Sequence, residues 1–470
     1  MKRFIKWGLR LSISFYALLH FFTYFYEVEM LLILLSISGI LMLLFAAMMF
    51  KVSQFKLPLF LFLVGVTVLT VSDGSVVSGM FDGFLQMRSI IGLLIIVPMI
   101  SWVLRDEPYI EEIMAFAHRG IDTSRKFYFG IVSFTQIISY FLLFGSIPMM
   151  HKFITVILKN QKGEAWENFK GTALLRAFAL STLWVISIPS FIFAVETMGA
   201  TLWIAILQGF GIAVIGTVIA VIFSYFQEKK YGVNLTAAIQ TEIDTVLRSY
   251  SDKEEMKKKV QEFLLLFVSL FGSIFLLHAI FGVNLMMIIP IVVIIWTGVY
   301  YLVKKRTKKL MFEAKRYVAE DMTKQSYQLS VLLAAGVLIF GLNQTGFATI
   351  VIDGVYYIQE IFPLINFLYL LPFIVILLGF LGLGPLTVMV LVAGLLGNIA
   401  LPFPPELIVL AITSGSVISI LLSPVIMPVI VLSASNGLGL FKNGVQFNYK
   451  YAIVFYIVVQ IYVQVMVQVW

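Results

Sequence analysis

Ionisable side chains within apolar stretches are the residues of this sequence best suited to chemistry. Arg176 and Glu196 flank one apolar segment, and Asp82 and Asp353 each precede a glycine at the edge of another. An ionised group is expensive to keep in hydrocarbon, so such residues usually mark substrate or proton pathways. Because burial raises the pKa of a carboxylic acid, Glu196 could carry a proton. We predict these four as coupling candidates; the alternative is an interfacial position for each.

Hydroxyl and amide side chains gather in two apolar segments that also contain proline. Pro189 interrupts the segment 172–197, and Pro424 interrupts the segment 406–434. Proline removes a backbone donor and breaks a helix, and the exposed helix ends can bind substrates or ions. The sequence therefore predicts a substrate- or ion-binding role for these residues: Ser181, Thr182, Ser187, Ser190, Ser414, Ser416, Ser435 and Asn436.

Composition places these segments in a membrane. Of the 470 residues, 60% are hydrophobic and 12% are charged, and the mean hydropathy is +1.00. That charged fraction is about half of what a soluble domain carries. At roughly 20 apolar residues per span, we predict an all-α polytopic membrane protein of about 11–13 transmembrane helices, with two repeated halves and re-entrant hairpins.

Several classes of chemistry find no support in the sequence. The absence of Cys excludes a thiol catalyst and a zinc–thiolate site, and the four His form no helical pair for a metal. The phosphate-binding loop of ATP-hydrolysing enzymes is missing. We therefore expect no enzymatic activity, no metal and no cofactor. The net charge of +8 indicates basic loops beside anionic lipid rather than a nucleic-acid partner.

Basic loops predict the orientation of the chain. The N-terminus, the loop with Lys51 and Lys56, the loop 227–262 and the cluster 304–309 all favour the cytoplasm. Seven apolar segments lie between the N-terminus and residue 227, so one of them must return to the side from which it entered. We predict that 172–197 is this re-entrant segment, which places the loop 151–171 outside. The loops 105–126 and 151–171 each carry four basic residues and do not decide the point.

Two weak internal matches predict a duplication. Gly65 precedes Asp82-Gly83 by the same spacing as Gly336 precedes Asp353-Gly354, and the Ser181–Pro189 spacing recurs at Ser416–Pro424. Chance similarity between apolar segments is the alternative. We predict four units, which follow in chain order: an N-terminal two-helix segment 1–56, a first repeat 57–226, a linker 227–328 with a cytoplasmic helix, two spans and a basic loop, and a second repeat 329–470.

This layout, the glycine-rich segment Gly336–Gly346 and the Ser/Pro-rich terminal hairpin resemble the ion-transporter superfamily of secondary carriers. That group includes arsenite, citrate, dicarboxylate and gluconate permeases. The resemblance implies repeats that are antiparallel in the membrane. The charge count instead starts both halves, at 57 and 329, from the inside, which favours parallel repeats. Both orientations stay open at this point.

The function favoured by these patterns is secondary active transport of a small, anionic solute across the cell (cytoplasmic) membrane of a bacterium, coupled to H⁺ or Na⁺. Duplicated halves with interrupted segments at matching positions are typical of such carriers. The alternative is a flippase or export protein for a lipid or a cell-envelope glycan; an envelope polymerase and a non-transporting scaffold are less favoured. The expected partners are the solute or ion and membrane lipid, and a homodimer is left open.

Overall fold

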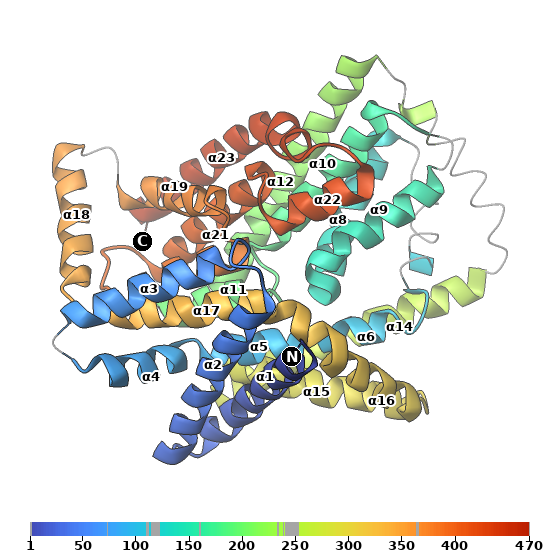
Figure 1. Ribbon diagram of the computed structural model, residues 1–470. Coiled ribbons are helices and arrows are strands. Elements are labelled where there is room, and N and C mark those ends of the chain that lie inside the picture. The colour runs from blue at the N-terminus through green and yellow to red at the C-terminus, as the bar shows by residue number, and fades with distance from the viewer. Residues whose placement is uncertain are drawn as a thin grey trace.

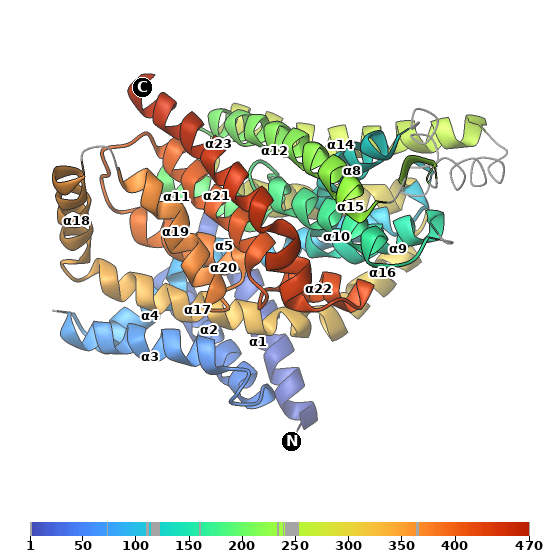
Figure 2. The same ribbon diagram turned by 90° about the horizontal axis from the view of Figure 1, so that it is seen from above.

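The computed structural model is a bundle of helices, as the composition predicts. It describes residues 2–72, 74–109, 112–113, 123–158, 161–232, 235–237, 239, 253–362 and 366–469. The model is 85% helical, and its described part contains no strand. Nine helical segments of that part are long and apolar enough to cross a membrane. The chain is therefore an all-α, multi-pass membrane protein (Figures 1 and 2).

Two groups of helices flank the broken segments along the chain, one at the N-terminus and one in the middle. The N-terminal group is α1 (Lys2–Phe25), α2 (Glu29–Met49), α3 (Lys56–Val71), α4 (Val76–Gln86), α5 (Arg88–Ile96) and α6 (Ile100–Leu104). The central group is α14 (Lys253–Phe281), α15 (Leu285–Val303), α16 (Thr307–Arg316), α17 (Met322–Asn343) and α18 (Phe347–Ile361). In Figure 1, α3 lies beside α17, against which it packs.

The basic clusters that predict the cytoplasmic side gather at one end of the bundle, which we call the basic end. Arg10 of α1 donates to the carbonyl of Ala319, just before α17. Phe50, after α2, packs its ring on Tyr327 in the early part of α17. Lys259 near the start of α14 and Arg306 after α15 both bind Glu107. The opposite end, where α14 turns into α15, is called the far end.

A set of five helices precedes α14. It comprises α8 (Ser124–Leu142), α9 (Ser146–Ile157), α10 (Glu164–Ser181), α11 (Pro189–Met198) and α12 (Leu202–Tyr231). Hydrogen bonds between helix termini show which of these termini lie close together. Ser124 at the start of α8 donates to Glu228 near the end of α12, and Tyr231, the last residue of α12, donates to Glu164 at the start of α10. These three helix termini therefore lie together at the basic end.

The segment that returns to its own side is α8–α9, not 172–197. His151 on α9 contacts Glu167 in the first turn of α10, so both termini of α8–α9 lie at the basic end. Between them, Leu143 adopts φ 48° where the chain reverses. In contrast, Glu196 near the end of α11 binds the start of α15 at the far end. The segment α10–α11 thus crosses the bundle, and the prediction that 172–197 is re-entrant was wrong.

The same five-helix pattern recurs after α18, with the opposite direction. Its members are α19 (Phe367–Phe380), α20 (Pro385–Leu396), α21 (Pro405–Leu422), α22 (Met427–Asn436) and α23 (Phe447–Val469). Asn366, before α19, binds Gln464 near the end of α23, as Ser124 binds the end of α12. The chain reverses between α19 and α20 at Gly382, with φ 94°.

Two contacts establish that the repeats are inverted. Glu164 at the start of α10 forms an ion pair with Lys442, which directly precedes α23, at 2.6 Å. Glu406 at the start of α21 accepts from the backbone N–H of Thr201, which directly precedes α12, at 2.8 Å. Equivalent helices of the two sets therefore start at opposite ends. This is the antiparallel arrangement that the resemblance implies and that the charge count did not favour. The predicted domain boundaries remain a prediction.

The two segments that share the Gly…Asp-Gly spacing are not the equivalent parts of a duplication that the sequence predicted. Gly65, Gly83 and Gly336 meet at one crossing, where a Cβ on Gly336 would lie 2.5 Å from the carbonyl oxygen of Gly83. Here α3 and α4 pack backbone-to-backbone on α17. Gly354 on α18, the sequence counterpart of Gly83, faces open space. The matched segments pack on each other, and their glycines do not occupy equivalent environments.

Candidate functional site

Both interrupted segments are broken helices, as proline predicts. Residues 182–188 separate α10 from α11, and Pro189 is the first residue of α11. Residues 423–426 separate α21 from α22, whose second residue is Pro428. The structural counterpart of Pro189 is therefore Pro428, not Pro424, and the predicted Ser416–Pro424 match was wrong in register. Pro424 lies within the second break itself.

Each break packs against the reversing hairpin of its own repeat. Trp184 in the first break donates through Nε1 to Gln136 of α8 at 3.2 Å, and Gln136 donates to Thr217 of α12 at 3.1 Å. Ser423 in the second break donates to the carbonyl of Gly379 of α19 at 3.0 Å. These bonds satisfy polar groups that a break exposes, as membrane burial requires.

The structure divides the predicted serines and threonine into satisfied and unsatisfied groups. Ser181 and Thr182 donate to carbonyls three residues earlier, at 2.6 and 2.7 Å, and so close the end of α10. Ser414 does the same within α21 at 2.9 Å. Ser187, in contrast, is buried in the first break, and its hydroxyl oxygen has no partner. A free hydroxyl in a break is better placed to bind a ligand than one that caps its own helix.

The remaining predicted residues lie in three places. Ser190 is buried in the first turn of α11. Ser416 is buried in the interior of α21, where its hydroxyl has no partner. Ser435 and Asn436 lie at the end of α22, beside the basic end, where Ser435 donates to the carbonyl of Val431 at 2.8 Å. The predicted residues therefore do not form one site, and Asn436 belongs to a separate network.

Arg176 is the centre of that network. Its side chain is fully buried on α10. Its Nε donates to Oδ1 of Asn448 at 3.0 Å, its Nη1 to the hydroxyl of Tyr128 at 3.1 Å, and its Nη2 to the carbonyl of Phe447 at 3.2 Å. The guanidinium also lies 4.6 Å from the ring centre of Tyr451, a favourable cation–π distance.

Every one of these partners is neutral. Among the described residues, no carboxylate forms an ion pair with Arg176. A buried cation normally requires a paired anion, because desolvation of an isolated charge is expensive. Arg176 therefore holds a positive charge inside the bundle that an anionic ligand could neutralise.

A chain of amides connects Arg176 to Asn436. Asn448 donates to the carbonyl of Asn443 at 2.9 Å. The Asn443 amide in turn donates to Oδ1 of Asn436 at 3.0 Å and accepts from its Nδ2 at 2.8 Å. Asn443 lies in a short π-helix, Lys442–Gln446, between the end of α22 and α23. We call Arg176, Tyr128, Asn448, Asn443 and Asn436 the Arg176 network.

Glu196 does not contact Arg176, although the two residues flank the same apolar segment in the sequence. Its Oε1 accepts from the backbone N–H of Leu285 at 2.7 Å, and its Oε2 accepts from the side chain of Asn284 at 2.8 Å. The carboxylate thus caps the start of α15, where the helix dipole favours negative charge. Arg176 and Glu196 lie in opposite halves of the bundle because α10–α11 crosses it.

The two aspartates lie outside the broken helices. Asp82 is exposed on α4, and Asp353 is exposed on α18. Neither helix belongs to the repeated sets. Their coupling role stays a prediction that the geometry does not favour.

Sequence reasoning missed a second cluster beside α22. Lys170 on α10 is 1% exposed and binds Glu167 at 2.5 Å, and Glu167 also contacts Nε2 of His151 at 3.2 Å. His151 and Ser435 line a cavity of about 640 Å³ between α9 and α22. The sequence signal was the i, i+3 spacing of Glu167 and Lys170 ahead of an apolar run. The loop 151–171 that holds them was predicted to lie outside.

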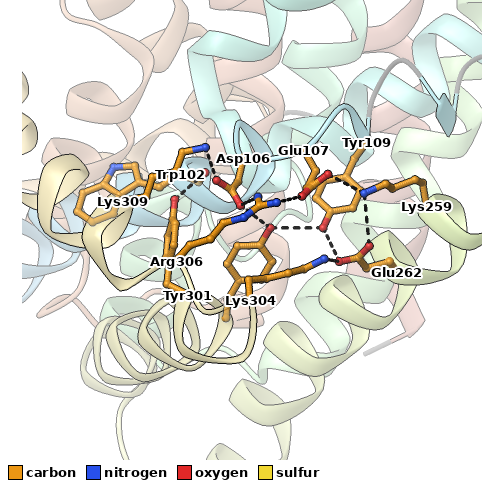
Figure 3. A network of polar contacts seen from close by, with 11 residues as sticks. Trp102, Asp106, Glu107, Tyr109, Lys259, Glu262, Tyr301, Lys304, Arg306 and Lys309 are labelled. Atoms are coloured by element: carbon orange, nitrogen blue, oxygen red, sulfur yellow. Dashed lines mark hydrogen bonds and ion pairs between the residues drawn. The ribbon is translucent and has the colours of Figure 1, made fainter.

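One cluster of charges at the basic end shows a different pattern, in which the labelled cations Lys259, Lys304, Arg306 and Lys309 each meet a carboxylate (Figure 3). Asp106 binds Arg306 and Lys309 and accepts from Tyr300 at 3.1 Å. Glu107 binds Lys259 at 2.6 Å. These contacts join the end of α6 to α14, α15 and α16. We call this group the basic-end ion network.

Ionisation of the basic-end ion network follows from these partners. Burial alone would raise the pKa of Asp106, but hydrogen bonds from Lys309, Arg306 and Tyr300 outweigh it and hold that pKa below its ordinary value. The hydrogen bond from Lys259 lowers the pKa of Glu107. Both carboxyls are therefore ionised at neutral pH, and the network holds helices together rather than offering a free charge.

Comparison with known proteins adds no family to these observations. The chain matches no protein-family model, and no curated protein matches it. The functional argument therefore depends on the fold and on the Arg176 network.

Proposed function

We propose that this protein is a secondary active transporter for a small anionic solute. The observation that carries the proposal is the position of Arg176, a buried cation without a carboxylate partner beside the broken helices of two inverted repeats. Inverted repeats with discontinuous helices are a common architecture of secondary carriers, whose substrates bind near the breaks. We assign no covalent chemistry to this protein.

The asymmetry between the repeats supports an anion rather than a cation. The helices α10 and α21 have the same length, and Arg176 in α10 corresponds, counted from the helix start, to Val417 in α21. One repeat therefore supplies the charge, while the other supplies neutral hydroxyls such as Ser416. A guanidinium binds carboxylate or phosphate oxygens in a planar, paired geometry, which suits a small organic or inorganic anion.

Coupling to H⁺ or Na⁺ is part of the proposal. The cluster of His151, Glu167 and Lys170 contains groups that can change their protonation, and it borders a cavity shared with α22. A proton taken up there would change the charge beside the broken helix of the second repeat. This arrangement favours H⁺, and a carrier driven by Na⁺ remains the alternative.

A binding screen over many candidate anions tests the proposal while the substrate is still unidentified. The purified protein is heated with a panel of mono-, di- and tricarboxylates and inorganic phosphate, and matched cations serve as the comparison set. At least one anion should raise the unfolding temperature of the wild type, and Arg176→Gln should abolish this rise. Arg125→Gln, which changes an exposed arginine at the start of α8, is the matched control and should keep it.

Transport then separates a carrier from a protein that only binds. In proteoliposomes, the selected anion should accumulate against its gradient when an H⁺ or Na⁺ gradient is imposed, and not when the gradient is collapsed. The proposal would be overturned if no anion raised the unfolding temperature of the wild type, or if the rise were equal in Arg176→Gln. Movement of labelled lipid between leaflets, without solute uptake, would favour the flippase.

A further inference from the structure

A second basic feature lies close to the Arg176 network and opens toward the membrane. It is a groove of about 490 Å³ at the basic end, between the last turns of α12, the start of α10 and the start of α23. Lys230 and Lys450 line it from α12 and α23, and no acidic side chain does. The groove thus lies where the two inverted repeats meet.

The charge of this groove is not neutralised by its surroundings. Lys230 and Lys450 form no ion pair among the described residues, and both are exposed. Glu164, at the start of α10, interacts with Lys230 through its charge but forms its ion pair with Lys442, at 2.6 Å. Behind the groove, Arg176 donates to the carbonyl of Phe447, which is part of the wall. Three positive charges therefore act on this space.

The remaining lining is suited to a molecule with an apolar part. Phe226 on α12 and Tyr449 on α23 line the groove, and their side chains are 59% and 44% exposed. Further along the same helices, Ile222 and Ile453 are exposed at 50% and 56%, as expected for surfaces that face lipid. The groove therefore continues onto the lipid-facing surface of α12 and α23.

One buried polar atom of the groove indicates that the ligand also carries a hydrogen-bond donor. Asn168 on α10 lines the groove and is 3% exposed, and its Oδ1 has no hydrogen-bond partner among the described residues. A buried acceptor without a donor is costly, so a ligand hydroxyl or ammonium would stabilise it. The groove thus offers cations for an anionic group and an acceptor for a neighbouring donor.

We propose that this groove binds the headgroup of an anionic phospholipid from the leaflet at the basic end. The phosphate lies between Lys230 and Lys450, a headgroup hydroxyl donates to Oδ1 of Asn168, and an acyl chain lies along Phe226 and Tyr449. Basic pockets between transmembrane helices bind anionic headgroups in this way. The lipid bridges the ends of the two repeats, and the proposal does not depend on the identity of a transported solute.

Thermal unfolding and native mass spectrometry test the lipid directly. Delipidated protein in a neutral detergent is titrated with phosphatidylglycerol, with phosphatidylcholine, and with soluble glycerol 3-phosphate or inorganic phosphate. Phosphatidylglycerol should raise the unfolding temperature by about 5 °C and give a bound-lipid peak. Phosphatidylcholine should do neither, and any stabilisation by the two soluble anions should persist in Lys230→Gln combined with Lys450→Gln, because it would come from the Arg176 network.

Charge-removal variants locate the effect. Lys230→Gln combined with Lys450→Gln should lose the stabilisation by phosphatidylglycerol and the bound-lipid peak. Lys229→Gln combined with Lys308→Gln removes two exposed cations that do not line the groove and should keep both. Equal stabilisation of the two double variants would overturn the site. A response to glycerol 3-phosphate as large as that to phosphatidylglycerol, and lost in Lys230→Gln combined with Lys450→Gln, would show that the groove takes a soluble anion and would overturn the lipid assignment.

Discussion

Arg176 shows how a single charge can be kept inside an apolar bundle. Three neutral oxygens accept its hydrogen bonds, and the rings of Tyr451 and Phe223 lie 4.6 and 5.8 Å from the guanidinium carbon. These contacts satisfy most of its donors without cancelling its charge. The positive charge therefore remains available to an anion.

Arg176→Lys should separate the charge from the geometry. Lysine keeps the positive charge but cannot donate at once to Asn448, Tyr128 and the carbonyl of Phe447. We expect the affinity for the selected anion to fall about 10- to 100-fold, which corresponds to about 1.4–2.8 kcal/mol. Calorimetric titration measures the change. Unchanged affinity in Arg176→Lys and in Arg176→Gln would show that Arg176 only supports the fold.

The contacts of Glu196 with Asn284 and Leu285 assign it a structural role as the cap of α15. Glu196→Gln weakens the cap of α15 by removing a charge-assisted acceptor at a helix start, at a cost of about 1 kcal/mol. The unfolding temperature should fall by about 1 °C, with the anion affinity unchanged. Normal stability together with transport that no longer responds to pH would instead identify Glu196 as the proton carrier.

The residue-level site could be predicted only in part from sequence. Arg176 and Asn436 stood out because polar groups are rare in such segments, and the structure includes both in one network. Asn443 and Asn448 were missed because Lys442–Lys450 is polar enough to pass for a connector. Asn443 lies in the π-helix Lys442–Gln446 and Asn448 in the first turn of α23 that follows it, and no spacing rule signals such a π-helix.

At the scale of elements, hydropathy and proline predicted where the helices are but not which way they run. The break after Ser181 and the break before Met427 follow from the chemistry of proline. Whether a broken segment crosses or returns depends on packing against other helices. The segments α8 and α9 form one nearly continuous apolar stretch, in which Gly145 is the one sequence sign of the reversal at Leu143–Gly145.

The crossing of α3, α4 and α17 predicts a contrast between two glycines matched by the sequence. Gly83→Ala places a Cβ 2.7 Å from Cα of Val337 and forces the helices apart. Overpacking of this kind costs about 1–3 kcal/mol. Gly354→Ala meets open space within a helix and should be neutral or stabilising by up to about 1 kcal/mol. Thermal unfolding of both variants measures the difference; equal effects would contradict the close crossing.

The basic-end ion network predicts a pH dependence of stability. Because the folded pKa values of Asp106 and Glu107 are lowered, these carboxylates stabilise the protein at neutral pH. That contribution begins to be lost as the pH falls below the ordinary carboxyl pKa of about 4 and is gone below the lowered values. Unfolding temperatures between about pH 3 and 7 should fall less steeply in Asp106→Asn than in the wild type. Parallel curves would show that Asp106 contributes nothing.

At the scale of the whole molecule, two inverted sets of five helices meet through their ends and through their broken segments. Contacts cross between the sets: α9 packs on α22, and α11 packs on α20. Each set therefore completes the surroundings of the other's broken helix. Movement of one set against the other would expose the breaks to alternate ends, as alternating access requires.

The direction of the repeats was hidden from the sequence for a physical reason. The loops 105–126 and 151–171 carry equal basic charge, and the described contacts on either side of each loop place both at the basic end. The equal basic charge of the two loops was the sign that α8–α9, which lies between them, returns to the side from which it starts. The parity count searched for one re-entrant segment and assigned it to 172–197, because proline there was more conspicuous than the reversal at Leu143.

Cysteine labelling of the two equivalent loops tests the inverted arrangement most directly. The chain has no Cys, so Lys162→Cys, between α9 and α10, and Asn398→Cys, between α20 and α21, each report one position. Lys308→Cys marks the basic end. With a membrane-impermeant maleimide, inverted repeats predict that Lys162→Cys is labelled from the same side as Lys308→Cys, and Asn398→Cys from the opposite side. Labelling of positions 162 and 398 from one side would contradict the inverted repeats and, with them, the proposed carrier.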